Sequence, residues 1–160
     1  MKSHEHAARI FTNEELLIAL VAERLDRLAD RMVYRCHDRL AVFGRLDHAT
    51  WLHQNIHGMR AFPICAYLTC AGLSEPDVPH TYQGRPVKDI DSGAVTDLAD
   101  TILISDDRHE QALYELAEKR FPPGTIIHRL YERLPIGTRS LERPVPVIRA
   151  ARAQTGLVMA

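Results

Sequence analysis

The chain has 160 residues, of which 46% are hydrophobic and 26% are charged. A chain of this length and composition is expected to fold as an ordinary globular domain with a sizeable core. Its formal net charge of −1 argues against a general electrostatic grip on nucleic acid or on an anionic lipid surface. No apolar stretch reaches the roughly 18–20 residues that cross a bilayer, and the N-terminus (MKSHEHAARI) lacks the apolar core of a signal peptide. We therefore expect neither a membrane nor a nucleic-acid partner.

A long helix is predicted over residues 13–36, after a capping residue at Thr12 or Asn13. Its apolar residues recur at steps of 3, 4, 3 and 4, which is a heptad pattern. The residues of this pattern are Ile18, Val21, Leu25, Leu28 and Met32. Two arrangements fit the pattern: a helix that packs on its own domain, or a homodimer formed through residues 13–36.

From residue 39 onward, short apolar runs alternate with helical stretches. The predicted strands are residues 39–44, 61–70, 101–105 and 125–131, and the predicted helices between them are residues 46–57 and 107–121. This alternation is typical of a parallel sheet with helices on both faces. We therefore predict an α/β fold: a small Rossmann-like parallel sheet of about four strands, flanked by helices and preceded by the long N-terminal helix.

The chain divides into three parts by composition. We expect an N-terminal helical segment at residues 1–38, a Rossmann-like domain at 39–134 and an extended tail, rich in proline and arginine, at 135–160. Within the domain, the glycines and prolines of residues 71–86 predict a loop.

Right-handed crossovers place strand 39–44 at the centre of the sheet, with 61–70 on one side and 101–105 on the other. The strand order then reverses between strands 39–44 and 101–105, and open sheets of this kind bind their ligands at such a switch point. Two loops face each other there, Gly44–His48 and Ser105–His109. The predicted ligand-binding residues in these loops are Gly44, Arg45, Asp47, His48, Ser105 and Asp106.

Three stretches carry a resemblance to a known kind of domain: VFGRLDHATWLHQN, TYQGRPVKDI and DTILISDDRHEQAL. Their order resembles a Rossmann-like domain found at the N-terminus of sugar O-acyltransferases and at the C-terminus of some sugar C-methyltransferases. Those domains read as strand, G-x-G-x-H-T, helix, strand, G-x-P-V, and a strand ending in S-S followed by x-x-x-E. The resemblance covers about residues 39–131. It implies binding of a nucleotide, a nucleotide-sugar or a similar small anion.

Two positions depart from that pattern. Leu46 stands near the place of the second glycine, the residue that lets backbone approach a phosphate. The second strand ends in Leu-Thr-Cys at residues 68–70, where such domains often carry an Asp or Asn able to hold a ribose. Both departures argue against NAD or NADP, and carboxylates at Asp47 and Asp106 would repel a diphosphate in the crevice. The cofactor, if there is one, is left unassigned.

Candidates for catalysis are Asp106, His109 and His48, as a general base or as ligand contacts. The competing interpretation is that Asp106 only caps the following helix. Ser105 lacks the glycine frame of a nucleophile elbow, which argues against a hydrolase.

Metal binding is not expected. His53 and His57 lie four residues apart on the predicted helix 46–57, a spacing at which two histidines can bind zinc with an added carboxylate. The intervening residues give no H-E-x-x-H motif, however, and a solvated helix face explains both histidines.

The cysteines bear on the compartment. The sequence contains an odd number, Cys36, Cys65 and Cys70, all in apolar contexts. Buried free thiols and a cytoplasmic setting are expected from this pattern.

Three functions remain open from the sequence. The first, which we predict, is a non-catalytic or regulatory Rossmann-like domain that binds a nucleotide, a nucleotide-sugar or a similar small anion in the crevice. The second is a small transferase or oxidoreductase acting on sugars or nucleotides. The third is a structural interaction module with a closed crevice. Near the end of the last strand, Arg129 and Arg133 could meet an anionic partner or line a solvated strand edge.

Overall fold

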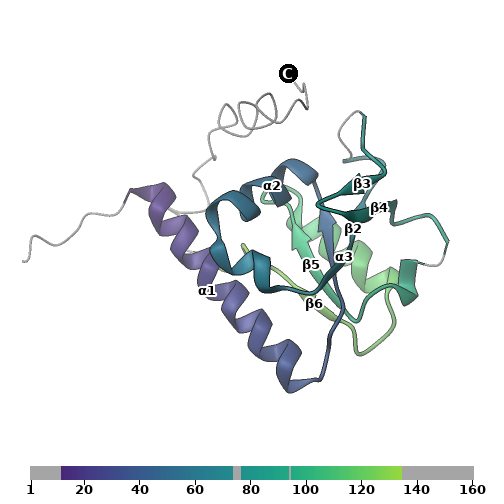
Figure 1. Ribbon diagram of the computed structural model, residues 1–160, viewed down its shortest axis with the longest axis horizontal. Coiled ribbons are helices and arrows are strands. Elements are labelled where there is room, and N and C mark those ends of the chain that lie inside the picture. Colours follow the sequence, from purple (N-terminus) through teal and green to yellow (C-terminus); the bar gives the residue numbers. More distant parts are fainter. Residues whose placement is uncertain (1–11, 74–76, 94, 135–160) are drawn as a thin grey trace, which may run out of the picture.

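A six-stranded sheet forms the centre of the molecule, and helices cover its faces (Figure 1). The computed structural model describes residues 12–73, 77–93 and 95–134. The helices are α1 (Asn13–Tyr34), α2 (Leu46–Asn55) and α3 (Glu110–Arg120), with short 3-10 helices η1 (His57–Ala61) and η2 (Val95–Asp97). The strands are β1 (Leu40–Gly44), β2 (Ile64–Thr69), β3 (Thr81–Tyr82), β4 (Arg85–Asp89), β5 (Thr101–Ser105) and β6 (Ile126–His128). The predicted tail at 135–160 lies outside the described residues.

The α/β class and the central position of β1 are confirmed. The strand order is β3-β4-β2-β1-β5-β6, and every neighbouring pair is parallel except β3 with β4. The chain adds β2 on one side of β1 and β5 on the other, as right-handed crossovers require. The switch point therefore lies between β1 and β5, where it was predicted.

The prediction of about four strands was wrong, because the loop region contains a hairpin. Strands β3 and β4 are joined through Gln83 and Gly84, whose φ angles are 52° and 73°. Two consecutive positive φ values are typical of the type I′ turn that links two-residue hairpins. Gln-Gly is a weaker signal for this turn than Asn-Gly or Asp-Gly, and the prolines of the region favour a loop.

Two apolar layers lie on opposite faces of the sheet because side chains alternate along each strand. Leu40 and Val42 of β1 pack in a cluster with α1, α2 and η1. Ala41 and Phe43 pack in a second cluster with α3. All five residues of β1 are buried, as expected for a central parallel strand.

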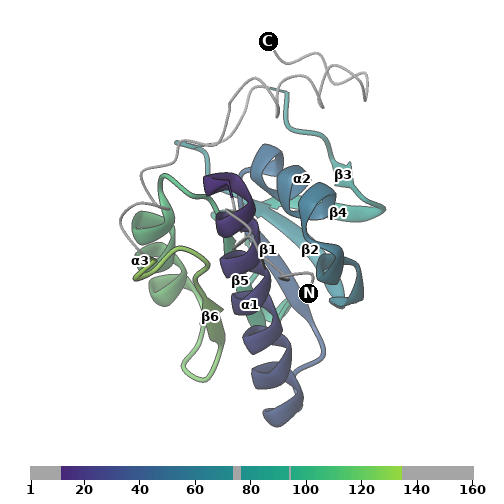
Figure 2. The same ribbon diagram turned by 90° about the vertical axis from the view of Figure 1, so that its left-hand side faces the viewer.

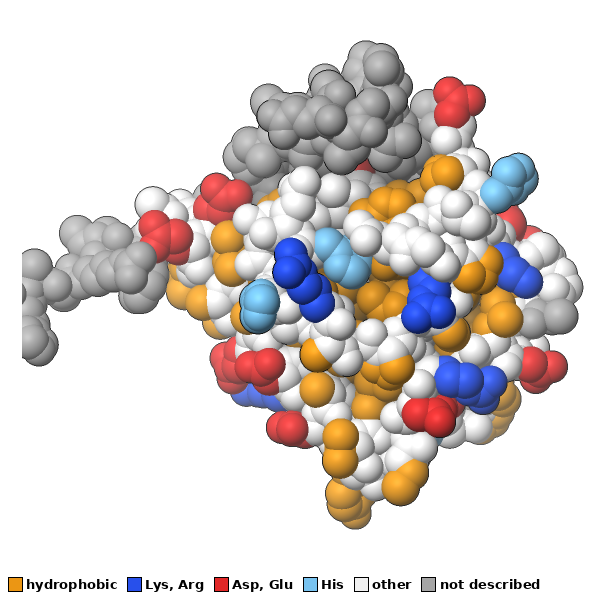
Figure 3. All heavy atoms as spheres, viewed as in Figure 1, with side chains coloured by type: hydrophobic (Ala, Val, Ile, Leu, Met, Phe, Trp, Pro, Cys, Tyr) orange, Lys and Arg blue, Asp and Glu red, His pale blue; other side chains and the backbone are white. Residues whose placement is uncertain are grey.

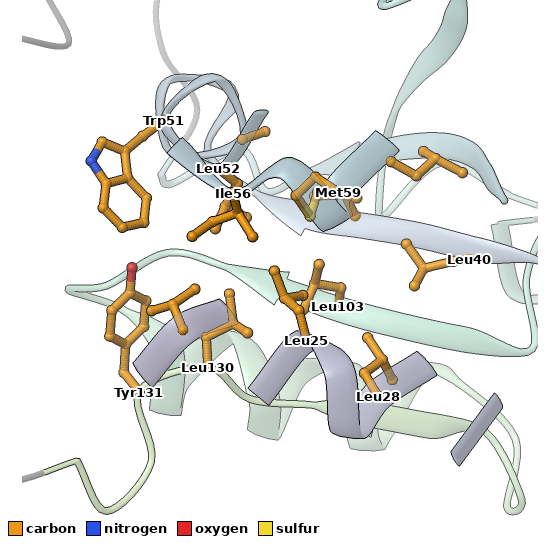
Figure 4. Close-up of a cluster of buried hydrophobic side chains, with 14 of the residues drawn as sticks. Leu25, Leu28, Leu40, Trp51, Leu52, Ile56, Met59, Leu103, Leu130 and Tyr131 are labelled. Atoms are coloured by element: carbon orange, nitrogen blue, oxygen red, sulfur yellow. The ribbon is translucent and has the colours of Figure 1, made fainter. Parts of the chain in front are cut away.

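The apolar residues of the heptad pattern in α1 pack against the sheet of the same chain. The buried side chains of α1 face the sheet, with Leu25 and Leu28 pointing toward Leu103 and Met59 in Figure 4. The buried residues of the helix are Leu17, Val21, Leu25, Leu28 and Met32. Ile18, which the pattern included, is only partly buried. The first of the two arrangements, a helix that packs on its own domain, is therefore present.

The end of α1 corrects the prediction for the cysteines. Cys36 has a φ of 56°, and the His37 amide donates to the Met32 carbonyl at 2.8 Å. This is the hydrogen bond of a Schellman C-cap, which places the left-handed residue at the surface. Cys36 is accordingly exposed, whereas Cys65 and Cys70 are partly buried, and all three are free thiols.

No helix among the described residues is both long enough and apolar enough to span a membrane.

Replacing Leu28 by Ala should show how much the fold depends on α1. Leu28 is fully buried, so the substitution removes packed methyl groups and leaves a cavity. We expect the free energy of unfolding to fall by about 2–4 kcal/mol in urea denaturation. The matched control is Asp26→Ala at an exposed position of the same helix, which should change stability by less than about 0.5 kcal/mol. Equal effects of the two substitutions would contradict the packing of α1 on the sheet.

Candidate functional site

The two loops predicted to face each other do meet at the carboxyl ends of β1 and β5. Gly44 is paired with Ser105 in the parallel ladder, and the Arg45 amide donates to the Ser105 carbonyl at 3.0 Å. The candidate residues of the two loops therefore lie beside one another at the switch point.

Gly44 is required for the close approach of β1 to β5. Its φ is 151°, and a Cβ built at this position would lie closer than 3.0 Å to the Ser105 carbonyl oxygen. Real Cβ atoms essentially never come so near to a backbone atom, and backbone has little freedom to move away. Gly44, which resembles the first glycine of a phosphate loop in the sequence, thus allows β1 and β5 to approach closely.

His48 joins three elements through its ring. Its Nδ1 is hydrogen-bonded to Ser105 Oγ at 2.6 Å, and its Nε2 is hydrogen-bonded to Tyr131 Oη at 2.6 Å. A neutral imidazole has one donor and one acceptor nitrogen, and hydroxyl groups can take either role, so one tautomer satisfies both bonds. The Tyr131 ring also meets the His48 ring edge-on, with centroids 5.5 Å apart. The exposed fractions of His48, Ser105 and Tyr131 are 2%, 0% and 2%.

Asp106 caps the turn that leads into α3. Its Oδ1 accepts hydrogen bonds from the Arg108 amide at 2.8 Å and the His109 amide at 3.0 Å. Its Oδ2 lies 3.2 Å from His109 Nδ1. The Asp106 side chain is fully buried, whereas that of His109 is 41% exposed. Of the two interpretations of Asp106, the capping one matches these contacts.

Asp47 lies in the first turn of α2. Its carboxylate forms a two-pronged ion pair with Arg45, with Nε to Oδ1 at 3.0 Å and Nη2 to Oδ2 at 2.8 Å. The same Oδ1 accepts a hydrogen bond from the His48 amide at 2.7 Å. Helix N-termini attract anions because their amide groups point outward. At this crevice, both helix N-termini already face a carboxylate of the chain itself.

Glu110 holds the segment after β6 in place. Its Oε2 accepts hydrogen bonds from the amides of Leu130 and Tyr131, each at 2.8 Å, and its Oε1 lies 3.4 Å from Arg129 Nε. Burial raises the pKa of Glu110, against the two amide hydrogen bonds and the Arg129 charge, which lower it. This anchoring fixes Tyr131 where its hydroxyl reaches His48.

Sequence reasoning missed Tyr131 altogether. Its bond to His48 joins residues 83 positions apart, and a lone tyrosine carries no local pattern that announces such a contact. Glu110 did have a signal, because it matches the glutamate of the resembled motif, although no role followed from it.

The two histidines considered for zinc do not lie on one helix. Helix α2 ends at Asn55, so His53 belongs to α2 and the exposed His57 begins η1. His53 Nε2 is instead hydrogen-bonded to Tyr67 Oη at 2.8 Å, and burial and the Arg60 charge lower its pKa. Within the described ranges, no group of three or more His, Cys, Asp or Glu side chains is placed to hold a metal ion.

Comparisons of this chain with protein-family models, with curated proteins and with solved structures gave no match.

The substitution Gly44→Ala tests the contact between β1 and β5. The added methyl group would meet the Ser105 carbonyl, and alanine disfavours the φ of this residue. We expect a loss of at least about 3 kcal/mol in the free energy of unfolding, measured in urea.

Gly58→Ala is the matched control, because a Cβ there has no neighbour within 4 Å. It should change stability by less than about 1 kcal/mol. A Gly44→Ala protein as stable as the control would show that the close approach of the strands is not rigid.

Proposed function

We propose that this chain is a non-catalytic Rossmann-like module whose crevice is closed by its own side chains. It would act as a structural or regulatory element rather than as a nucleotide-binding domain. The observation that carries the proposal is the buried hydrogen-bonded group His48, Ser105 and Tyr131 at the switch point. These side chains bond to one another at the place where domains of this topology receive a ligand.

The charges at the crevice support the same conclusion. The carboxylates of Asp47 and Asp106 accept hydrogen bonds from backbone amides at the starts of α2 and α3. A bound diphosphate would have to displace them or lie beside them, and like charges in a buried site repel strongly. Arg45, the one arginine among the candidate residues, is ion-paired with Asp47. Binding of an anion at the crevice, the function that we predict from the sequence, is therefore disfavoured.

Catalysis at the crevice, the second function that the sequence leaves open, has little support. Ser105 and His48 do form the contact that a nucleophile and its general base would need. The Ser105 side chain is nevertheless fully buried, and both His48 nitrogens are hydrogen-bonded within the protein. A nucleophile must reach its substrate, so this arrangement favours a structural role.

The resemblance to sugar O-acyltransferase and C-methyltransferase domains remains part of the proposal. The parallel strands run β4-β2-β1-β5-β6, an order that those Rossmann-like domains would share. On this view, the chain keeps the topology of those domains, while the side chains at its crevice are buried as part of the core. It would then be associated with a sugar-modifying system without catalysing the reaction.

Titration with NAD, a nucleoside diphosphate and a nucleotide-sugar tests the closed crevice. Any binding of these ligands that isothermal calorimetry detects should not respond to a change of charge at the crevice. The informative variant is Asp106→Asn, which keeps the oxygen that accepts from the Arg108 and His109 amides but removes the negative charge. An open crevice would bind a diphosphate more tightly in this variant, whereas a closed one would not respond. Tighter nucleotide binding by Asp106→Asn would overturn the proposed function.

A homodimer through residues 13–36 also remains a proposal. The apolar side of α1 that packs on the sheet is not free for a second copy, so the dimer would use the exposed residues Leu16, Val33 and Tyr34. Val33 and Tyr34 are 79% and 90% exposed, which supports a contact near the end of the helix.

Light scattering on Val33→Asp tests this dimer without touching the core. The charge should convert a dimer to a monomer, because an unpaired carboxylate is costly inside an apolar interface. Asp30→Asn, at another exposed position of α1, should leave the mass unchanged. The dimer is excluded if the unaltered chain already has the mass of a monomer.

A further inference from the structure

A second polar region lies away from the crevice, beside β6. Strand β6 runs between α1 and α3 in Figure 2. Side chains of these elements and of the segment after β6 line a hollow of about 380 Å³. Four arginines line it: Arg24 and Arg31 from α1, and Arg129 and Arg133 from the segment after β6. We call this region the basic hollow. On the face shown in Figure 3, by contrast, basic side chains are dispersed among acidic and apolar ones.

Four arginines and one glutamate, Glu132, line the basic hollow, and within the described ranges most of these arginines form no ion pair. Arg129 is the exception, because it pairs with Glu110 at 3.4 Å and with Glu132 at 3.6 Å. Among the residues that the structure describes, Arg24, Arg31 and Arg133 form no ion pair. The whole chain has a net charge of −1, so this cluster is a local feature and not a result of composition.

Burial disfavours the charge of Arg24, whereas Arg31 and Arg133 are exposed. Arg24 is partly buried, and burial lowers the pKa of its guanidinium group against the attraction of Glu110 and Glu132. Arg24 and Arg31 are seven residues apart on α1, two helical turns, which places them on the same side of the helix. Like charges held together beside apolar surface favour the binding of an anion that neutralises them.

His128, at the end of β6, supplies an independent observation. Its side chain lines the basic hollow and is only 8% exposed, and its Nε2 has no hydrogen-bond partner among the described residues. Burial, together with the charges of Arg31, Arg24 and Arg27, lowers the pKa of His128 to about 4. The ring is thus neutral at pH 7. A buried nitrogen without a partner is unfavourable, and a ligand oxygen or hydroxyl would satisfy it.

We propose that the basic hollow binds the phosphate group of a small molecule. Guanidinium groups match phosphate oxygens with paired, charge-assisted hydrogen bonds, and three of those that line the hollow form no ion pair with a described residue. The volume lies within the range of small-molecule sites, so it has room for more than a single phosphate. The Tyr114 ring, on which Arg129 stacks at 4.7 Å, provides an aromatic wall. The site is separate from the crevice and does not depend on the crevice being closed.

Calorimetric titration with pyrophosphate, inorganic phosphate and a sugar phosphate at low ionic strength tests the site. We expect pyrophosphate to bind with a Kd below about 1 mM and to bind more weakly as salt is added. If the sugar phosphate binds more tightly than inorganic phosphate, the site takes the group as part of an organic molecule. If inorganic phosphate binds as tightly, the phosphate group alone is recognised.

Arg24→Gln is the decisive variant, and Arg27→Gln is its matched control. Both substitutions remove one positive charge from α1, but Arg27 pairs with Glu23 at 2.6 Å and does not line the basic hollow. Arg24→Gln should weaken pyrophosphate binding at least about tenfold, since it removes a charge-assisted contact, whereas Arg27→Gln should change it less than about twofold. Equal weakening by both would indicate a diffuse electrostatic effect and would overturn the site.

Location can be checked in the unaltered protein. The ring resonances of His128 in NMR spectra should shift as pyrophosphate is added, while those of His48 at the crevice should not. Absence of pyrophosphate binding, or a shift at His48 alone, would contradict the proposal. Binding that responds to Arg24→Gln but not to Asp106→Asn would support the basic hollow and leave the closed crevice intact.

Discussion

The close approach of β1 and β5 at Gly44 is the constraint on which the crevice depends. The missing side chain lets the Ser105 carbonyl accept the Arg45 amide across the ladder. That contact brings the start of α2 beside the end of β5, so that His48 reaches Ser105. In a nucleotide-binding loop, a glycine at this point leaves space for phosphate. Here the backbone of β5 fills that space. A glycine at this position can therefore either admit a phosphate or allow two strands to approach closely.

A second set of contacts closes the same end of the sheet from the other side. Glu110, the first residue of α3, binds the amides of Leu130 and Tyr131 and thereby sets the path of the chain after β6. Tyr131 then completes the hydrogen bonding of His48. A buried carboxylate is costly unless it is hydrogen-bonded, and Glu110 meets that condition by organising a loop. The same segment carries Arg129 and Arg133, so the anchoring that closes the crevice also positions half of the basic hollow.

The sequence was sufficient for the α/β class, the presence of the long helix and the switch point, because these follow from periodicity and from crossover handedness. It did not decide whether the long helix packs on its own domain. Leu25 and Leu28 repeat at helical spacing, and the centre of β5 is the apolar run Ile-Leu-Ile. Sequence reasoning failed where a contact joins residues far apart in the chain. It also failed where a rare backbone conformation determines whether a hairpin forms. Tyr131 and His48 illustrate the first case, and the Gln83–Gly84 hairpin illustrates the second. The candidate residues lie together at the switch point, but only the structure shows that several of them bond to one another.

Electrostatics distinguishes the two polar regions of this molecule. At the crevice, each carboxylate meets an amide or a guanidinium group, so the charges are balanced within the chain. At the basic hollow, three guanidinium groups and a buried imidazole nitrogen have no such partner among the described residues. A balanced site gains little from a charged ligand, since binding must first break existing bonds. An unbalanced site gains the most, and for that reason any anion that this fold recognises should be sought beside β6 and not at the switch point.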